Sequence, residues 1–227
     1  MVNRIIVALD VPTIEEANRL ATDLAPVVGG FKVGMELLMG VGPLAIETIA
    51  DHDKPVFVDA KLHDIPNTVE RAAAQIQAAG ARWVTVHAGG GVDMIEAANA
   101  AMGGTGVLVV TMLTSLTASD LPILGIDADL EDHVVDMARL ATKASAEGVV
   151  CSPAEVRAVK MAEPGLEVFT PGVRPGTSKN DDQKRVATPE AARADGADYL
   201  VVGRPITGSS DPVVSAREIA SSIAAFD

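Results

Sequence analysis

The sequence is poor in cysteine and in aromatic residues. Among 227 residues there are one cysteine, one tryptophan and one tyrosine, and aromatic residues make up 3% of the chain. The single Cys151 excludes an intrachain disulfide and a metal site built from several thiolates. Because it lies in the apolar run Gly148–Ser152, we expect a buried, unreactive thiol there. The core must be built from Val, Ile, Leu and Ala, as is usual for buried parallel sheets.

Basic residues and long hydrophobic runs are also scarce. The chain carries 18 Lys and Arg against 31 Asp and Glu, a formal net charge of -13. Such a surface repels nucleic-acid phosphates and anionic lipids, which argues against both as partners. No run approaches the roughly 18 apolar residues of a membrane span, and the N-terminus shows no signal-peptide pattern. We therefore expect a cytoplasmic protein.

Eight short, mostly apolar runs recur along the chain, and they are continuous rather than alternating. This pattern predicts strands that are buried on both faces. Hydrophobic residues make up 48% and charged residues 22% of the sequence, an ordinary globular balance. The expected strands are Arg4 to Asp10, Phe31 to Met35, Pro55 to Lys61, Trp83 to Ala88, Gly106 to Leu113, Gly148 to Ser152, Glu167 to Val173 and Tyr199 to Arg204.

Segments with helical periodicity separate these runs, and capping residues mark where several of them begin. The expected N-caps are Thr13, Ser152, Thr188 and Asp211, the last three directly before a proline. The spacing averages about 28 residues per strand–helix unit, which predicts an α/β fold, a single (β/α)8 TIM-barrel domain over residues 1–227. An open doubly wound sheet is the alternative. It favours a glycine-rich turn after the first strand, where this chain has Asp10-Val11-Pro12.

Charged residues lie at the ends of the first three expected strands. Asp10 ends the first, Lys32 lies in the second, and Asp59 and Lys61 end the third, with Asp64 three residues further on. Residues two apart on a strand project to the same side, so Asp59 and Lys61 should lie together at the barrel mouth. The plainer interpretation is a structural ion pair that closes the barrel. The functional one is a set of fixed charges that positions a proton donor.

Glycine-rich loops with an arginine follow the last two expected strands. Pro171–Gly176 contains Arg174, and Val202–Pro205 contains Arg204. TIM barrels commonly bind a phosphate at this place through backbone N–H groups, and the arginines would add charge-assisted hydrogen bonds. Alternatively, glycine and proline only shape the turns and the arginines are solvated. The connections Ser115 to Asp129 and Arg174 to Thr188 are longer than usual, which favours functional loops.

Other polar residues near strand ends have plainer explanations. His87 can be a hydrogen-bonded histidine at the barrel mouth, and His63 can simply orient its loop. Thr114 and Ser115 have no neighbour that would activate a nucleophile. No histidine cluster has the spacing of a zinc or iron site, although a Mg²⁺ site of carboxylates stays possible in principle.

The segment Asp59-Ala60-Lys61-Leu62-His63-Asp64-Ile65-Pro66-Asn67-Thr68 resembles the catalytic segment of the orotidine 5'-monophosphate decarboxylases. Ala60 and Leu62 are smaller than the residues usual there, which bears on packing more than on chemistry. The resemblance covers the whole chain through further motifs, which are ALD in the first strand, FKVG in the second, TVHA in the fourth, LTS at Leu113 to Ser115, PGVRP, DDQKR at Asp181 to Arg185, and VVGRPI.

The resemblance implies a TIM barrel that converts orotidine 5'-monophosphate to uridine 5'-monophosphate in pyrimidine biosynthesis, without metal or organic cofactor. Asp59, Lys61, Lys32 and Asp64 would form a charged catalytic network. Lys61 would protonate the ring carbon that CO₂ leaves, and Asp59 would lie against the substrate carboxylate. Lys32 would hold Asp59 and the ribose, and Asp10 would also bind the ribose.

The resemblance also implies a homodimer with shared active sites. Asp64, Ile65 and Thr68 would reach into the site of the neighbouring subunit. Either Thr114 or Ser115 would contact the pyrimidine. The expected phosphate ligands are Arg174, Gln183, Gly203 and Arg204.

Two rival functions remain open from the sequence. Keto-sugar-phosphate decarboxylases and aldolases of the same superfamily share the Asp-x-Lys-x-x-Asp pattern but use Mg²⁺ and an enediolate. The Ile-Pro-Asn-Thr continuation and the loop from Arg174 to Gln183 favour the nucleotide enzyme. The other rival is a barrel that binds a phosphate ligand without catalysis.

Overall fold

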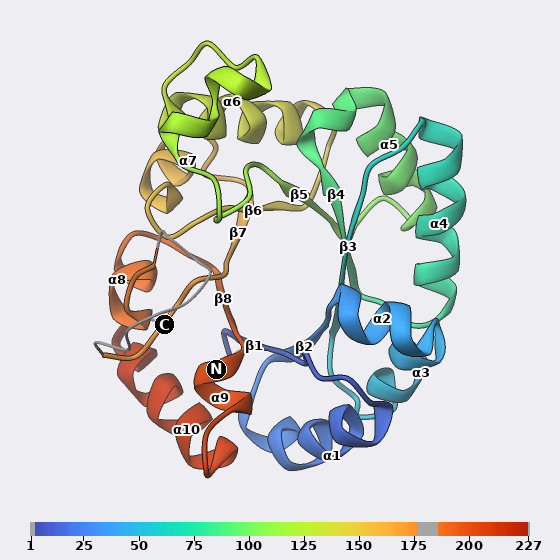
Figure 1. Ribbon diagram of the computed structural model, residues 1–227, viewed down its shortest axis with the longest axis vertical. Coiled ribbons are helices and arrows are strands. Elements are labelled where there is room, and N and C mark those ends of the chain that lie inside the picture. The colour runs from blue at the N-terminus through green and yellow to red at the C-terminus, as the bar shows by residue number, and fades with distance from the viewer. Residues whose placement is uncertain (1–2, 177–185, 227) are drawn as a thin grey trace.

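The computed structural model describes residues 3–176 and 186–226, and its eight parallel strands close into a barrel in sequential order (Figure 1). Every expected apolar run contains a strand, so the predicted TIM barrel is confirmed and the open doubly wound sheet is wrong. The strands are β1 (Ile5–Ala8), β2 (Gly30–Val33), β3 (Val56–Leu62), β4 (Trp83–His87), β5 (Val107–Val110), β6 (Gly148–Val150), β7 (Glu167–Thr170) and β8 (Tyr199–Val202).

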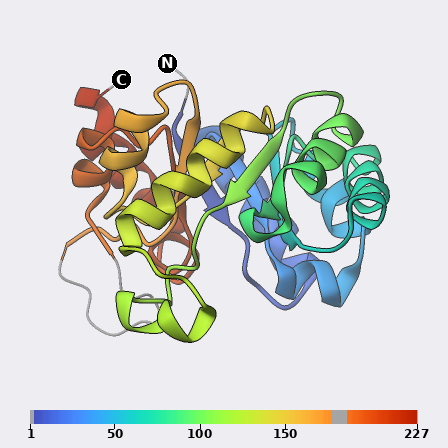
Figure 2. The same cartoon turned by 90° about the horizontal axis from the view of Figure 1, so that it is seen from above.

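Helices form a ring around the strands (Figures 1 and 2). Short 3-10 turns supplement them at Ala25–Val27, Ala88–Gly90, Ala118–Asp120, Pro122–Leu124 and Ala224–Phe226. In the part of the chain that the structure describes, no helix has the length and apolar character to cross a membrane. The α-helices are α1 (Ile14–Leu24), α2 (Met35–Val41), α3 (Leu44–Ala50), α4 (Pro66–Ala78), α5 (Gly91–Ala101), α6 (Leu130–Lys143), α7 (Val156–Ala162), α8 (Pro189–Ala194), α9 (Arg204–Thr207) and α10 (Pro212–Ile223).

Three of the four expected N-caps are confirmed. The side chains of Thr13, Thr188 and Asp211 each accept a hydrogen bond from a backbone N–H in the first turn of α1, α8 and α10. The prediction for Ser152 is wrong, because α7 begins only at Val156. The carbonyl of Ser152 accepts a hydrogen bond from the Glu155 N–H at 3.1 Å, so the chain completes a separate turn before the helix starts.

Phe57, Trp83, Phe169 and Tyr199 gather inside the barrel. Phe169 lies at the centre of this group, with its ring centroid 5.7 Å from that of Phe57 and 5.1 Å from that of Trp83. The interior cluster consists of Ile6, Ala8, Phe57, Trp83, Leu108, Phe169 and Val201, while the alternate strand residues pack outward against the helices. The interior of the barrel is therefore a packed core.

Two carboxyl groups near the N-terminal ends of the strands have opposite electrostatic surroundings. Burial would raise the pKa of Glu147, but hydrogen bonds from Arg82, Trp83 and the Gly106 N–H lower it below the usual value. Burial raises the pKa of Glu167, and the nearby carboxylate of Glu147 raises it further. One carboxyl oxygen of Glu167 is buried without a hydrogen-bond partner. Folding therefore favours the ionised form of Glu147 and the protonated form of Glu167.

We predict that Glu167→Gln stabilises the protein at pH 7. The neutral amide removes a negative charge that burial and the nearby Glu147 carboxylate disfavour. Relief of about 1 kcal/mol raises the Tm of a chain of this size by about 2–4 °C. The gain should shrink as the pH falls from 7 and be lost at about pH 4, because Glu167 in the unsubstituted protein, whose pKa folding raises, then binds a proton. Thermal unfolding between pH 4 and pH 8 measures it.

Glu147→Gln is the matched control for this experiment. It removes a carboxylate that accepts three hydrogen bonds, so it should lower the Tm at pH 7. A lower Tm for Glu167→Gln at pH 7 would contradict the electrostatic contrast between the two glutamates.

Candidate active site

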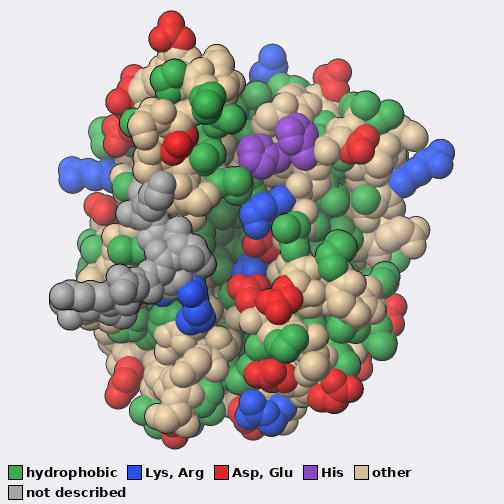
Figure 3. All heavy atoms as spheres, in the orientation of Figure 1, with side chains coloured by type: hydrophobic (Ala, Val, Ile, Leu, Met, Phe, Trp, Pro, Cys, Tyr) green, Lys and Arg blue, Asp and Glu red, His purple; other side chains and the backbone are tan. Residues whose placement is uncertain are grey.

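A pocket of about 500 Å³ opens at the C-terminal ends of the barrel strands. Figure 3 shows acidic and basic side chains gathered around a hollow in the middle of this face. The expected site residues that line the pocket are Asp10, Lys32, Asp59, Lys61, Thr114, Arg174, Gly203 and Arg204. The topology thus brings residues from β1, β2, β3, β5, β7 and β8 to one cavity.

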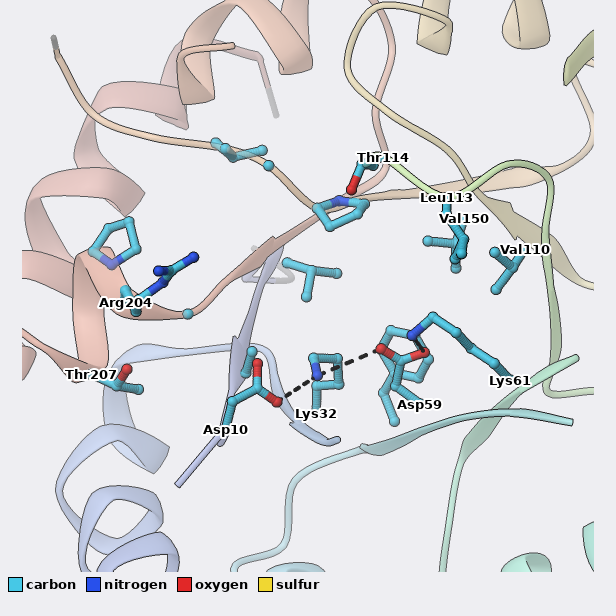
Figure 4. Close-up of a pocket in the computed structure, with 18 of the residues that line it drawn as sticks. Asp10, Lys32, Asp59, Lys61, Val110, Leu113, Thr114, Val150, Arg204 and Thr207 are labelled. Atoms are coloured by element: carbon cyan, nitrogen blue, oxygen red, sulfur yellow. Dashed lines mark hydrogen bonds and ion pairs between the residues drawn. The ribbon is translucent and has the colours of Figure 1, made fainter. Parts of the chain in front are cut away.

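Four side chains with alternating charge form a row along one wall of the pocket (Figure 4). The Lys32 ammonium lies 2.8 Å from Asp10 Oδ1 and 3.5 Å from Asp59 Oδ2. The Lys61 ammonium lies 2.8 Å from Asp59 Oδ1. Lys32 is only 7% exposed, so its charge is tolerated in the barrel because two carboxylates flank it.

The two lysines keep Asp59 ionised. Burial alone would raise the pKa of Asp59, but the positive charges of Lys32 and Lys61 and hydrogen bonds from Lys61 and Thr85 lower it below its usual value. Between the two ammonium groups there is thus a fixed carboxylate. Fixed charges of this kind need no reorganisation when charge develops on a bound molecule.

Lys61 reaches Asp59 through a bulge and not through simple strand alternation. Between the pairs Val58↔Val84 and Leu62↔Val86, β3 advances by four residues while β4 advances by two. Lys61 lies in this irregular segment with a positive φ of 48°, a left-handed conformation that is rare outside glycine. The expected proximity of the two side chains is present, but the expected geometry of the strand is wrong.

Two residues near the charged row were not singled out from the sequence. Thr85 on β4 accepts a hydrogen bond from the Lys61 N–H at 2.8 Å and donates one to Asp59 Oδ1 at 3.0 Å. Gly34 follows β2, and a Cβ there would collide with the Asp10 carboxylate and lie 2.8 Å from Lys32 Nζ. The available signals were a lone hydroxyl within the apolar TVHA run and the glycine of FKVG.

The opposite end of the pocket carries the arginine loops. Figure 4 shows Arg204 on the far side of the cavity from Lys61, with Asp10 and Lys32 between them. Arg174 and Gly203 also line the pocket. Gln183 lies outside the described residues. The pocket therefore has a cationic end well separated from the Asp59–Lys61 pair.

The remaining expected site residues lie away from the pocket wall. Asp64, Ile65 and Thr68 are exposed, and Asp64 accepts a hydrogen bond from the Ile65 N–H at 2.7 Å. Ser115 is exposed and is not a lining residue, whereas its neighbour Thr114 is. Of the two candidates for the pyrimidine contact, only Thr114 faces the cavity in this structure.

His63 and His87 form a stacked pair, and Figure 3 shows histidine side chains near the hollow. The ring centroids of His63 and His87 lie 5.4 Å apart with an interplanar angle of 12°. Burial lowers the pKa of His87, and the nearby His63 and Lys61 lower it further. Neither ring lines the pocket, which favours the plainer interpretation of both.

Within residues 3–176 and 186–226, no group of three or more His, Cys, Asp or Glu side chains could hold a metal ion. Asp59 is the most enclosed carboxylate of the pocket, and its oxygens already face Lys32 and Lys61. The donor set therefore suits an anionic ligand held by cations better than a divalent metal.

Comparisons with known proteins agree with this geometry. Residues 3–219 match the model of the "Orotidine 5'-phosphate decarboxylase / HUMPS family". The chain belongs to this family. An orotidine 5'-phosphate decarboxylase of Anaeromyxobacter sp. (strain K) is 50% identical over 222 residues, covering 97% of this chain and 98% of that protein. One from Sphingopyxis alaskensis is 44% identical over 224 residues, covering 98% and 100%.

Solved structures of the orotidine 5'-phosphate decarboxylase / HUMPS family share the fold. The crystal structure of orotidine 5'-phosphate decarboxylase from Lactobacillus acidophilus superposes with a TM-score of 0.85 at 33% identity, and it covers 97% of this chain and 99% of that one. The similarity extends over nearly the whole of both chains.

Proposed function

We propose that the protein decarboxylates orotidine 5'-monophosphate to uridine 5'-monophosphate, a step of pyrimidine biosynthesis, with Lys61 as the proton donor. The observation that carries the proposal is the Lys61 ammonium, 2.8 Å from the Asp59 carboxylate in a pocket whose opposite end carries Arg174 and Arg204. The family, and relatives at 44% and 50% identity named as orotidine 5'-phosphate decarboxylases, support the same reaction.

The two ends of the pocket suit the two ends of this nucleotide. Arg174 and Arg204 bind the phosphate with charge-assisted hydrogen bonds, and Gly203 lets it approach the backbone closely. The Lys32 ammonium and the Asp10 carboxylate bind the ribose hydroxyls. Thr114 contacts the pyrimidine, whose carboxylate then lies against the charged row. Binding energy from the distant phosphate thereby orients the reacting carbon.

The chemistry needs a cation beside the carbon that loses CO₂. The bond between the ring carbon and the carboxylate breaks, CO₂ leaves, and the electron pair stays on the ring carbon. The Lys61 ammonium gives a proton to that carbon, and solvent returns a proton to the lysine afterwards. Lys32 and Lys61 together hold Asp59 ionised. Asp59 in turn holds the Lys61 ammonium in place at 2.8 Å before negative charge develops on the ring carbon.

A magnesium-dependent reaction on a keto-sugar phosphate suits this pocket less well. An enediolate needs a divalent cation on its two oxygens, and such a cation would have to compete with Lys32 and Lys61 for Asp59. We therefore infer that the reaction needs no metal and no organic cofactor. A barrel that only binds a phosphate ligand would not need the charged row at the other end of the pocket.

We further propose a homodimer in which Asp64, Ile65 and Thr68 complete the site of the partner. These residues are exposed and do not line the cavity of their own barrel. Large apolar side chains are exposed in the neighbouring elements α2 and α3 and before α4, which lie on one side of the barrel (Figure 1); they are Met35 at 53%, Met39 at 76%, Leu44 at 55% and Ile65 at 66%. Exposed apolar patches of this kind mark protein interfaces.

We predict that Lys61→Ala abolishes turnover and keeps binding of uridine 5'-monophosphate. The substitution removes the proton donor but leaves Arg174 and Arg204 at the other end of the pocket. Spectrophotometric loss of orotidine 5'-monophosphate measures turnover, and calorimetry measures binding. Lys143→Ala, at an exposed lysine in the last turn of α6, is the control and should behave like the unsubstituted protein.

Near-normal kcat in Lys61→Ala would remove Lys61 from the donor role. The unsubstituted protein should also keep its activity after dialysis against EDTA. Activity that is lost with EDTA and restored by Mg²⁺ would favour the keto-sugar-phosphate reaction, and tight nucleotide binding without any turnover would favour a binding protein.

We predict that Asp64 acts in trans. Lys61→Ala and Asp64→Ala should each be nearly inactive, but a mixed dimer collects both lesions in one site and leaves the other site intact. Random exchange of equal amounts makes half of the dimers mixed, so about a quarter of the unsubstituted activity should return.

The matched control mixes Lys61→Ala with Asp59→Asn. Both residues line the pocket of their own chain, so every site of that mixed dimer carries a lesion and no activity should return. If subunit exchange is verified and the first mixture also stays inactive, Asp64 serves its own chain.

A further inference from the structure

Thr85 is a buried polar residue in direct contact with the reacting pair, and the proposed function gives it no role. It lies in the middle of β4 with a fully buried side chain. Its hydroxyl has two partners, both on the neighbouring strand β3. It accepts from the Lys61 N–H at 2.8 Å and donates to Asp59 Oδ1 at 3.0 Å. One hydroxyl thus connects the backbone of one charged residue to the side chain of the other.

The bulge in β3 creates the need for this contact. Between Val58 and Leu62 the regular pairing with β4 is interrupted, so the Lys61 N–H points at a side-chain oxygen where a strand would offer a carbonyl. The left-handed conformation of Lys61 is strained and persists only where its surroundings hold it. The Thr85 hydroxyl supplies that support from the adjacent strand.

The same hydroxyl also restricts Asp59. Asp59 Oδ1 accepts from Thr85 and from the Lys61 ammonium at 2.8 Å, while Oδ2 faces Lys32 at 3.5 Å. Each carboxylate oxygen therefore has a donor on a different element, and the carboxylate plane is fixed. Because threonine is β-branched, its χ1 is restricted, and the hydroxyl direction is well defined.

We infer that Thr85 is a positioning residue for the decarboxylation, whose hydroxyl holds Lys61 in the β3 bulge and Asp59 in line with it. This inference rests on the roles of Lys61 and Asp59 given above. Thr85 touches neither the cavity nor the substrate, since it is not among the pocket-lining residues. Its effect should therefore be on the chemical step and not on nucleotide affinity.

The test compares three variants of the intact protein. Thr85→Val keeps the shape of the side chain but removes both hydrogen bonds, and Thr85→Ser keeps the hydroxyl. Thr170→Val is the matched control, because Thr170 is a fully buried threonine of β7 whose hydroxyl has no hydrogen-bond partner among the residues that the structure describes. For each we measure kcat with orotidine 5'-monophosphate, the Kd of uridine 5'-monophosphate and the Tm.

Thr85→Val should lower kcat about 100-fold, which is the loss that a small misplacement of reacting groups produces. The Kd of uridine 5'-monophosphate should change by less than about threefold, because the phosphate end is untouched. Thr85→Ser should recover most of kcat, and Thr170→Val should keep it. This pattern supports the inference.

Three results would overturn it. One is a kcat for Thr85→Val within about twofold of the unsubstituted protein. Another is equal loss in Thr85→Ser and Thr85→Val, which would remove the hydroxyl as the cause. The third is a parallel loss of kcat, nucleotide binding and Tm in Thr85→Val, which would make Thr85 a requirement of the fold. A failure of the proposed function itself is distinguishable, because the unsubstituted protein would then leave orotidine 5'-monophosphate unchanged.

Discussion

The arrangement of the active site depends on the position of the Asp59 carboxylate between the ammonium groups of Lys32 and Lys61. A carboxylate and an ammonium group are both costly to bury in their charged forms unless opposite charges lie within contact distance. Lys32 is 7% exposed and lies 2.8 Å from Asp10 and 3.5 Å from Asp59, so each charge in the row is compensated by its neighbour. The small Gly34 leaves room for this approach. The row can therefore stay charged in an enclosed pocket, where electrostatic effects on a bound molecule are strongest.

The barrel supplies the rigidity that this row requires. Below the pocket the interior is filled by Phe57, Trp83, Phe169 and their apolar neighbours. Lys32 and Asp59 belong to the strands that surround this packed interior and not to loops. Among the described strand pairs, the register shifts at the β3 bulge, which brings the Lys61 ammonium back to Asp59. The residue to which we assign the proton transfer thus has a left-handed backbone conformation, and the Thr85 hydroxyl supports it from the adjacent strand.

Much of this arrangement is predictable from the sequence, for reasons that also explain the failures. Strands buried on both faces must be continuously apolar, so the eight runs identify the barrel, and charges at their ends can only lie at its mouth. The bulge is not predictable in this way, because the period of two assumes regular pairing. Thr85 has no charge, and a lone hydroxyl in an apolar run is a weak signal that acquires a meaning only from its two partners in the fold. Ser152 has the sequence pattern of an N-cap, but the chain first forms a separate turn closed by the Glu155 N–H and the Ser152 carbonyl, and α7 begins only at Val156.

The central claim is that the two lysines hold Asp59 ionised in the empty site, so that its charge is in place before the substrate binds. Carbon-13 NMR of labelled aspartate carboxyl groups tests this most directly, with Asp59→Asn to assign the signal. We predict that the Asp59 signal stays that of a carboxylate from pH 7 down to about pH 4, because its pKa lies below the usual value. A titration of that signal with a midpoint above about pH 5 would contradict the account.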